Sequence, residues 1–203
     1  INPRDGHQGM VVWDTQNKPF YLSDEQQLDV YHQVAYLLTR AYDPDATRQI
    51  YPWHHAAGDF IMRVSDASVA LRLITVRQYA PTLGAGDGDL DDEARLMALL
   101  VFFLTLTLRN RIDRLDGTGD MAWAGSGAVA ASVRGSIEAL PMAIKIKFIN
   151  LLISYDVSEL MDVLQLVADR YVLMSMEKDL IRAHLASHGD QLVAALQALR
   201  HNP

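Results

Sequence analysis

The feature that most constrains this chain is an almost purely apolar run, LMALLVFFLTLTL, from Leu96 to Leu108. A helix that crosses a bilayer needs about 20 apolar residues, so this run is too short and we expect no membrane partner. Acidic residues precede the run and basic residues follow it, which is the charge order that the helix macrodipole favours. The sequence therefore predicts one long helix over about residues 92–116, ended by Gly117 and buried at the centre of the core.

The rest of the second half also has helical patterns. The segment MAIKIKFINLLIS alternates apolar residues with lysine as a strand would, but its position among helices favours a helix. The sequence DVSE, from Asp156 to Glu159, is typical of a helix N-terminus, and Gly189 predicts a break between two final helices. The glycine stretches DGTGD and WAGSGAV are interpreted as a connection from helix to helix. The predicted helices cover about residues 126–140, 142–154, 157–171, 176–187 and 190–200.

The first third mixes strands with one helix. MVVW and FYL, separated by the turn-like DTQNKP, predict one hairpin. SDEQ at Ser23–Gln26 has the spacing of a capping box and predicts a helix over about 24–41. The segment DFIMRVSDASVALRLITVRQYAP predicts a second hairpin around SDAS, because β-branched residues are frequent in it. A helix through Val69, Leu73 and Val76 is the alternative.

These patterns together predict a single domain of the mainly α (α+β) class. Residues 1–85 would form its mixed αβ part and residues 91–203 its helical part, and no internal repeat or long linker divides them. A chain of 203 residues is long enough to bury one sizeable core. It begins with Ile, as a piece trimmed from a longer protein would.

The composition argues against several classes of function. The formal net charge is −7, whereas a general nucleic-acid binder usually shows a basic surface. There is no cysteine, which excludes disulfides, thiolate nucleophiles and cysteine zinc sites. No secretory signal peptide is visible at the N-terminus. We therefore expect a soluble cytoplasmic protein that binds no nucleic acid.

The densest group of polar and aromatic side chains lies in IYPWHHAAGDF. If this segment is functional, His55 is the catalytic base or ligand, and Asp59 orients one of its ring nitrogens. Tyr51 and Trp53 would then form an apolar wall, and His54 would contact a backbone carbonyl. The alternative is a structural turn in which the rings pack and Asp59 caps the next segment.

The same residues resemble a known motif. His54, His55 and Asp59 form HH-x-x-x-D, which resembles the acyl-transfer motif of condensation domains and chloramphenicol-acetyltransferase-like enzymes. The resemblance implies that His55 deprotonates the attacking hydroxyl or amine and that Asp59 supports the site. Read from His54, the spacing H-x-x-x-x-D is similar to that of the glycerolipid acyltransferases. The chain departs from the condensation motif at Phe60, where the family has glycine.

A second candidate site is the basic end of the predicted long helix. Arg109, Arg111 and Arg114 lie within six residues of each other in LRNRIDRLDG. Arginine suits the bidentate recognition of a carboxylate or a phosphate, so these three residues are candidates for ligand binding. The alternative is a surface network of ion pairs with the interleaved Asp113 and Asp116.

No cofactor and no metal site is predicted. Adjacent histidines on a strand point to opposite faces, so the HH pair is poorly placed to share one ion. Asp87, Asp89 and Asp91 match the first three ligand positions of an EF-hand loop, but Asp92 occupies the position of its invariant glycine.

Two functional hypotheses follow from these patterns. The first is a helical protein-interaction or regulatory module whose partner is another protein or a second copy of the chain. It is favoured by the apolar helices of the second half and by the Met-rich YVLMSMEKD. The second is an enzyme or small-ligand binder, for an acyl or phosphate-bearing ligand, with its polar site at Tyr51–Asp59. Residues that line a pocket with an arginine would favour the second hypothesis, and residues packed inside would favour the first.

Overall fold

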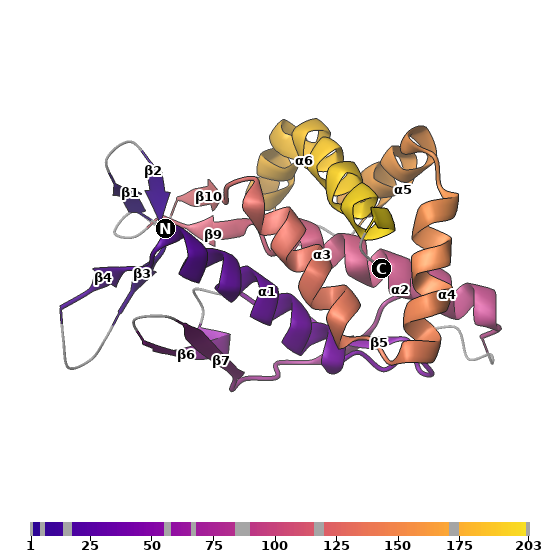
Figure 1. Ribbon diagram of the computed structural model, residues 1–203, viewed down its shortest axis with the longest axis horizontal. Coiled ribbons are helices and arrows are strands. Elements are labelled where there is room, and N and C mark those ends of the chain that lie inside the picture. Colours follow the sequence, from indigo (N-terminus) through magenta and orange to yellow (C-terminus); the bar gives the residue numbers. More distant parts are fainter. Residues whose placement is uncertain are drawn as a thin grey trace.

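The computed structural model describes residues 2–4, 7–13, 18–54, 58–65, 68–83, 90–115, 120–170 and 175–201. This part of the chain is mainly helical, with a few short antiparallel strand pairs, which confirms the predicted mainly α (α+β) class (Figure 1). None of its helices is long and apolar enough to cross a membrane.

The described elements are six helices and five strand pairs. The helices are α1 (Asp24–Arg40), α2 (Asp92–Arg109), α3 (Gly127–Ala139), α4 (Met142–Ser154), α5 (Val157–Arg170) and α6 (Ser175–His201). The antiparallel pairs are β1 (Asn2–Arg4) with β2 (His7–Gly9), β3 (Val11–Val12) with β4 (Phe20–Tyr21), β5 (Arg48–Ile50) with β8 (Tyr79–Pro81), β6 (Phe60–Val64) with β7 (Val69–Leu73), and β9 (Ile112–Arg114) with β10 (Met121–Trp123).

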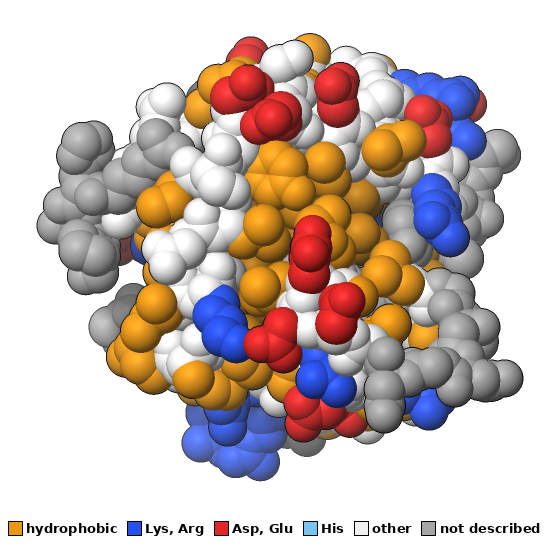
Figure 2. Space-filling model, turned by 90° about the vertical axis from the view of Figure 1, so that its right-hand side faces the viewer, with side chains coloured by type: hydrophobic (Ala, Val, Ile, Leu, Met, Phe, Trp, Pro, Cys, Tyr) orange, Lys and Arg blue, Asp and Glu red, His pale blue; other side chains and the backbone are white. Residues whose placement is uncertain are grey.

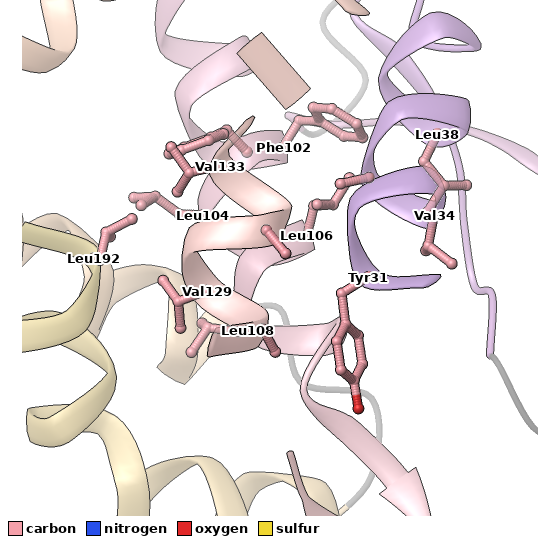
Figure 3. Packing of buried hydrophobic residues seen from close by; sticks show 14 of the residues in the cluster. Tyr31, Val34, Leu38, Phe102, Leu104, Leu106, Leu108, Val129, Val133 and Leu192 are labelled. Atoms are coloured by element: carbon pink, nitrogen blue, oxygen red, sulfur yellow. The ribbon is translucent and has the colours of Figure 1, made fainter. Parts of the chain in front are cut away.

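Helix α2 is the centre of the core, as predicted. The Asp91 side chain caps it by accepting a hydrogen bond from the Ala94 N–H at 2.8 Å. Apolar residues of α2 face three other helices, and Figure 3 shows them between side chains of α1, α3 and α6. Because neighbours cover the helix on most sides, its apolar run needs no polar face. The α2 residues labelled in Figure 3 are Phe102, Leu104, Leu106 and Leu108.

The predicted C-terminal end of this helix is wrong. Helix α2 ends at Arg109 rather than near residue 116, because Ile112–Arg114 pairs with Met121–Trp123 to form β9 and β10. The Ala124 N–H also donates a hydrogen bond to the Arg111 carbonyl, at 2.8 Å. The predicted direct connection between helices is therefore a strand pair that leads into α3, although most of DGTGD lies outside the described residues.

Helices α1 and α3 have the most extensive contact among the described elements. A Cβ atom added at Gly135 of α3 would lie 2.1 Å from the carbonyl oxygen of His32 in α1, so the two backbones touch directly. Asn110, at the end of α2, joins the pair. Its amide donates to the Tyr31 carbonyl at 2.8 Å and contacts the Ser132 hydroxyl at 2.7 Å.

Helices α5 and α6 pack against each other. The predicted interruption at Gly189 is wrong, because α6 continues through it. A Cβ atom at Gly189 would lie 2.1 Å from the Met161 sulfur, so the glycine allows α5 to approach α6. The predicted start of α5 is confirmed, since the side chains of Asp156 and Glu159 each accept the other's backbone N–H at 2.9 Å.

The predicted hairpins of the first third are both present, as β3–β4 and β6–β7. Side chains of α1 cover the outer edge of β7. The Gln33 amide donates to the Val69 carbonyl and accepts from the Leu71 N–H, and the Asp29 carboxylate accepts from the Val69 N–H. The β5–β8 pair was not predicted, since its strands lie far apart in the sequence.

Candidate functional site

The segment from Tyr51 to His54 follows β5 and turns inward. The Tyr51 N–H donates to the Gln78 carbonyl at 3.1 Å, and the peptide bond to Pro52 is cis. Trp53 is buried, with its ring edge-on to Phe60. His55 lies outside the described residues, so its predicted role as a base stays a prediction.

Asp59 is completely buried and holds this turn together. Its carboxylate accepts the His54 N–H at 2.9 Å and pairs with the Arg77 guanidinium at 2.9 to 3.2 Å. Its own carbonyl accepts the Ile74 N–H at 2.9 Å. Asp59 therefore joins the segment to the residues that connect β7 with β8. The ion pair also holds the pKa of Arg77 above its ordinary value.

The structure brings Tyr51, Trp53 and His54 together around Arg109. The Arg109 guanidinium lies 5.1 Å from the centre of the Tyr51 ring and 5.9 Å from that of Trp53, within cation–π distance. It donates to the Trp53 carbonyl at 3.2 Å and forms an ion pair with Glu177 of α6 at 3.1 Å. Sequence reasoning missed Glu177, because no local pattern relates α6 to this segment.

This Arg109 cluster is closed to solvent at its charged centre. The Arg109 side chain is 5% exposed and the Glu177 side chain 1%. Burial lowers the pKa of His54, and the nearby charge of Arg109 lowers it further. Burial also raises the pKa of Tyr51. Glu177 Oε1 and Arg109 Nε are buried without a hydrogen bond to any described residue. The cluster could therefore offer a polar ligand two further hydrogen bonds, but no net charge to bind it.

The other two predicted arginines differ in their relation to this cluster. Arg111 is buried elsewhere: it donates to the Ala124 carbonyl at 2.6 and 3.0 Å, donates to the Gln191 amide oxygen at 2.7 Å and lies 4.6 Å from the Trp123 ring centre. Burial lowers the pKa of Arg111 to about 10. Arg114 is exposed on β9. Burial, then Arg109 and, more weakly, the charge of Arg114 lower the pKa of His54, so Arg114 lies within electrostatic reach of the cluster. Arg111 has separate partners, and the predicted ligand-binding role of the three arginines stays a prediction.

A buried histidine that the sequence did not nominate lies next to Arg111. His188 of α6 is fully buried; its Nε2 is 3.3 Å from the Thr107 hydroxyl, and its ring meets Trp123 edge-on. Burial, and secondarily the charge of Arg111, lowers the pKa of His188 to about 3. The ring is therefore neutral in the folded protein at all ordinary pH values.

His188 is expected to make stability depend on pH. The unfolded chain binds a proton at His188 below its ordinary pKa of about 6.5, whereas the folded chain resists it down to a pKa of about 3. The free energy of unfolding should therefore fall as the pH is lowered from about 6.5 towards 3. Denaturant unfolding over this range should give a shallower decline for His188→Gln than for the natural chain. An identical decline in both proteins would contradict the assignment.

A small cavity lies away from these polar residues, between the C-terminal end of α1 and the junction of α3 with α4. Its volume is about 50 Å³, and Tyr42, Leu140 and Ile144 are among the residues that line it. Sites for small molecules have volumes of about 300–1,000 Å³, so this cavity is too small for a metabolite. Within the described ranges, no three histidine or carboxylate side chains are grouped as a metal site; Asp87 and Asp89 lie outside those ranges.

The chain matches no family model, no curated protein and no solved structure. The resemblance to acyltransferases therefore depends on the residues of HH-x-x-x-D alone. Most of the sequence-predicted site residues that the structure describes are packed inside.

Proposed function

We propose that this chain is a cytoplasmic protein-interaction module that binds through an exposed apolar stripe on α4. The α4 stripe consists of Met142, Ile146, Ile149 and Ile153, spaced four, three and four residues apart along one side of the helix. The side chains of Met142, Ile146 and Ile153 are 66%, 54% and 38% exposed, and that of Ile149 is partly buried. This stripe is the observation that carries the proposal.

Helix α4 is unusual because few of its apolar residues are fully buried, although Ile144, Ile149 and Leu151 pack partly against the core. Only Phe148 and Leu152 of this helix are buried. Fully burying a side chain of this size stabilises a protein by about 1.5–3 kcal/mol. Soluble proteins rarely leave contiguous apolar surface uncovered, and larger patches usually mark a binding surface. A partner that covers the α4 stripe would recover this energy.

The surroundings of the α4 stripe resemble those of an interface. Figure 2, which looks at the end of the molecule formed by α4 and α5, shows hydrophobic side chains gathered across the middle of the face. Basic side chains lie around them, and acidic side chains lie both around and among them. Apolar surface flanked by charged residues is common at protein–protein interfaces.

The Arg109 cluster also favours the interaction module over the enzyme or ligand binder. Arg109 already has Glu177, a backbone carbonyl and two aromatic rings as partners, and Asp59 has Arg77. These groups are already paired with one another and contribute to the core. The net charge of −7 and the absence of cysteine support a cytoplasmic protein that does not bind nucleic acid.

Site-specific photo-cross-linking tests the proposal. A photoreactive amino acid at Ile146, in the cells that make the protein, is expected to give a discrete cross-linked protein product. Ala183, exposed on α6, is the control position and should give none. Adding Ile149→Glu should remove the product, because a charge in the stripe opposes burial. No product at Ile146, or equal products at both positions, would refute the proposal.

Ligand binding at the Arg109 cluster is the second candidate, favoured by the convergence of Tyr51, Trp53 and His54 on Arg109. Residue His55 would be its base. A thermal-shift screen with metals, nucleotides and acyl-CoAs separates the two functions, since a bound ligand raises the melting temperature. An interaction module should show no shift. A shift that His55→Ala abolishes, without unfolding the protein, would establish the second candidate instead.

A further inference from the structure

We infer that the partner of the α4 stripe is a second copy of this chain, docked antiparallel about a two-fold axis. The inference rests on the proposed function and adds the identity of the partner. It is based on three features of α4: the spacing of its apolar residues, the distribution of charge along it, and the extent of apolar surface around it.

The spacing of the stripe suits a copy that runs in the opposite direction. In a two-fold antiparallel pair, the N-terminal end of one helix lies against the C-terminal end of the other. Met142 would then face the partner's Ile153 or Val157, and Ile146 and Ile149 would lie near the axis. Val157, the first residue of α5, is also exposed and extends the apolar surface beyond the end of α4. Each apolar residue therefore has an apolar counterpart.

The charges of this region are self-complementary in the same orientation. The charged residues of α4 are both cations in its first half, Lys145 and Lys147. The exposed carboxylates of Asp156 and Glu159 follow its C-terminal end. An antiparallel copy places the lysine end of each helix beside the acidic end of the other. A parallel copy would place lysines against lysines, which opposes association.

The internal partners of these charges leave them available for a second copy. Lys147 forms an exposed ion pair with Asp92 at 2.7 Å, and Lys145 contacts the Glu138 carbonyl at 3.4 Å. Exposed ion pairs of this kind are weak and exchange readily. The carboxylates of Asp156 and Glu159 each accept one backbone N–H in the cap of α5 and remain at the surface.

The size of the surface predicts a reversible dimer. A standard interface buries about 800 Å² on each partner. Helix α4 is only about 20 Å long, so its stripe supplies part of that area. Partly buried apolar side chains beside α4, such as Met97 and Tyr155, which touch each other at 3.6 Å, can supply more. We therefore expect dissociation at low micromolar concentration rather than a permanent dimer.

Light scattering over a concentration series is the first test. The natural chain should approach twice its 22.7 kDa mass at high micromolar concentration. Ile146→Glu should raise the dissociation constant roughly tenfold or more, because it places a charge at the centre of the interface. Ala183→Glu, the same class of change at an exposed position of α6, should leave it unchanged. At a concentration where the natural chain is monomeric, both variants should keep its melting temperature, which shows that they fold.

Cross-linking through single introduced cysteines tests the orientation of the two copies. Because the chain has no natural cysteine, only the introduced residue can react. With a short bis-maleimide, Ile149→Cys should cross-link to its own copy, since it lies near the axis. Met142→Cys should not, because antiparallel copies of that residue lie roughly 16 Å or more apart along the helix axis. Efficient cross-linking of Met142→Cys to itself would indicate a parallel pair and would overturn the inference.

The outcomes also separate this inference from the proposed function. A monomer at every concentration, together with position-specific photo-cross-linking of Ile146 to a different protein, would overturn the second copy and leave the interaction module standing. A monomer with no photo-cross-link at Ile146 would overturn both. A dimer that Ile146→Glu does not weaken would place the interface elsewhere and also overturn the inference.

Discussion

Replacing Gly135 with alanine is expected to destabilise the protein by about 3 kcal/mol or more. The added Cβ would lie 2.1 Å from the His32 carbonyl oxygen, 3.0 Å from its carbonyl carbon and 3.1 Å from the Tyr36 nitrogen. All three are backbone atoms of α1, so no flexible side chain can move aside and the helices must separate. Overfilling a packed site usually destabilises a protein by about 1–3 kcal/mol. Because the clash here is with backbone, we expect a loss at or above the upper end of that range.

Denaturant unfolding measures this effect, and the chain offers a matched control. A Cβ atom at Gly125 would meet nothing within 4 Å, and this glycine precedes the same helix. Gly125→Ala should therefore change the free energy of unfolding by no more than about 0.5 kcal/mol. Equal small effects at both positions would show that α1 and α3 do not approach as closely as the structure has them.

Replacing Glu177 with leucine is expected to cost about 3–5 kcal/mol. The carboxylate is the buried counter-charge of Arg109, and removing one partner of a buried ion pair leaves the other charge without compensation. The double variant Arg109→Met with Glu177→Leu should recover much of that loss, because both charges are then absent. Lys147→Met breaks the exposed pair with Asp92 and should have a far smaller effect.

Denaturant unfolding of Arg109→Met, Glu177→Leu and the double variant forms a cycle that isolates the interaction between the two side chains. If the double variant loses as much stability as the two single variants combined, then Arg109 and Glu177 act independently. That result would refute the buried ion pair as the centre of the Arg109 cluster.

Local sequence signals predicted most helix starts correctly. Ser23 and Gln26 form the capping box that SDEQ indicates, with hydrogen bonds of 2.9 and 3.2 Å in the two directions. Such bonds join residues three apart, so their pattern is visible in a short window. The prediction failed at Arg109, where α2 ends so that Ile112–Arg114 can pair with a strand across an intervening turn. Pairing of this kind is decided by tertiary contacts.

The break predicted at Gly189 failed for a related reason. Glycine weakens a helix when considered alone, yet here a helix neighbour needs the space that a Cβ would fill. The candidate site was also predicted only in part, because local residues were found and distant partners were missed. Tyr51, Trp53 and Arg109 were nominated and do come together, but their charged partner Glu177 lies on α6, and Arg77 was not connected with Asp59. Partners on distant elements leave no spacing to recognise.

The position of α1 has a consequence for how the chain can be divided. Its tightest neighbour is α3 in the helical part, while its Asp29 and Gln33 side chains hold the outer edge of β7 in the mixed part. We therefore expect neither part to keep its structure without its contacts to α1. Cutting the chain near residue 85 would therefore give two fragments that fold only in each other's presence, and heating the intact chain should melt both parts in one cooperative transition.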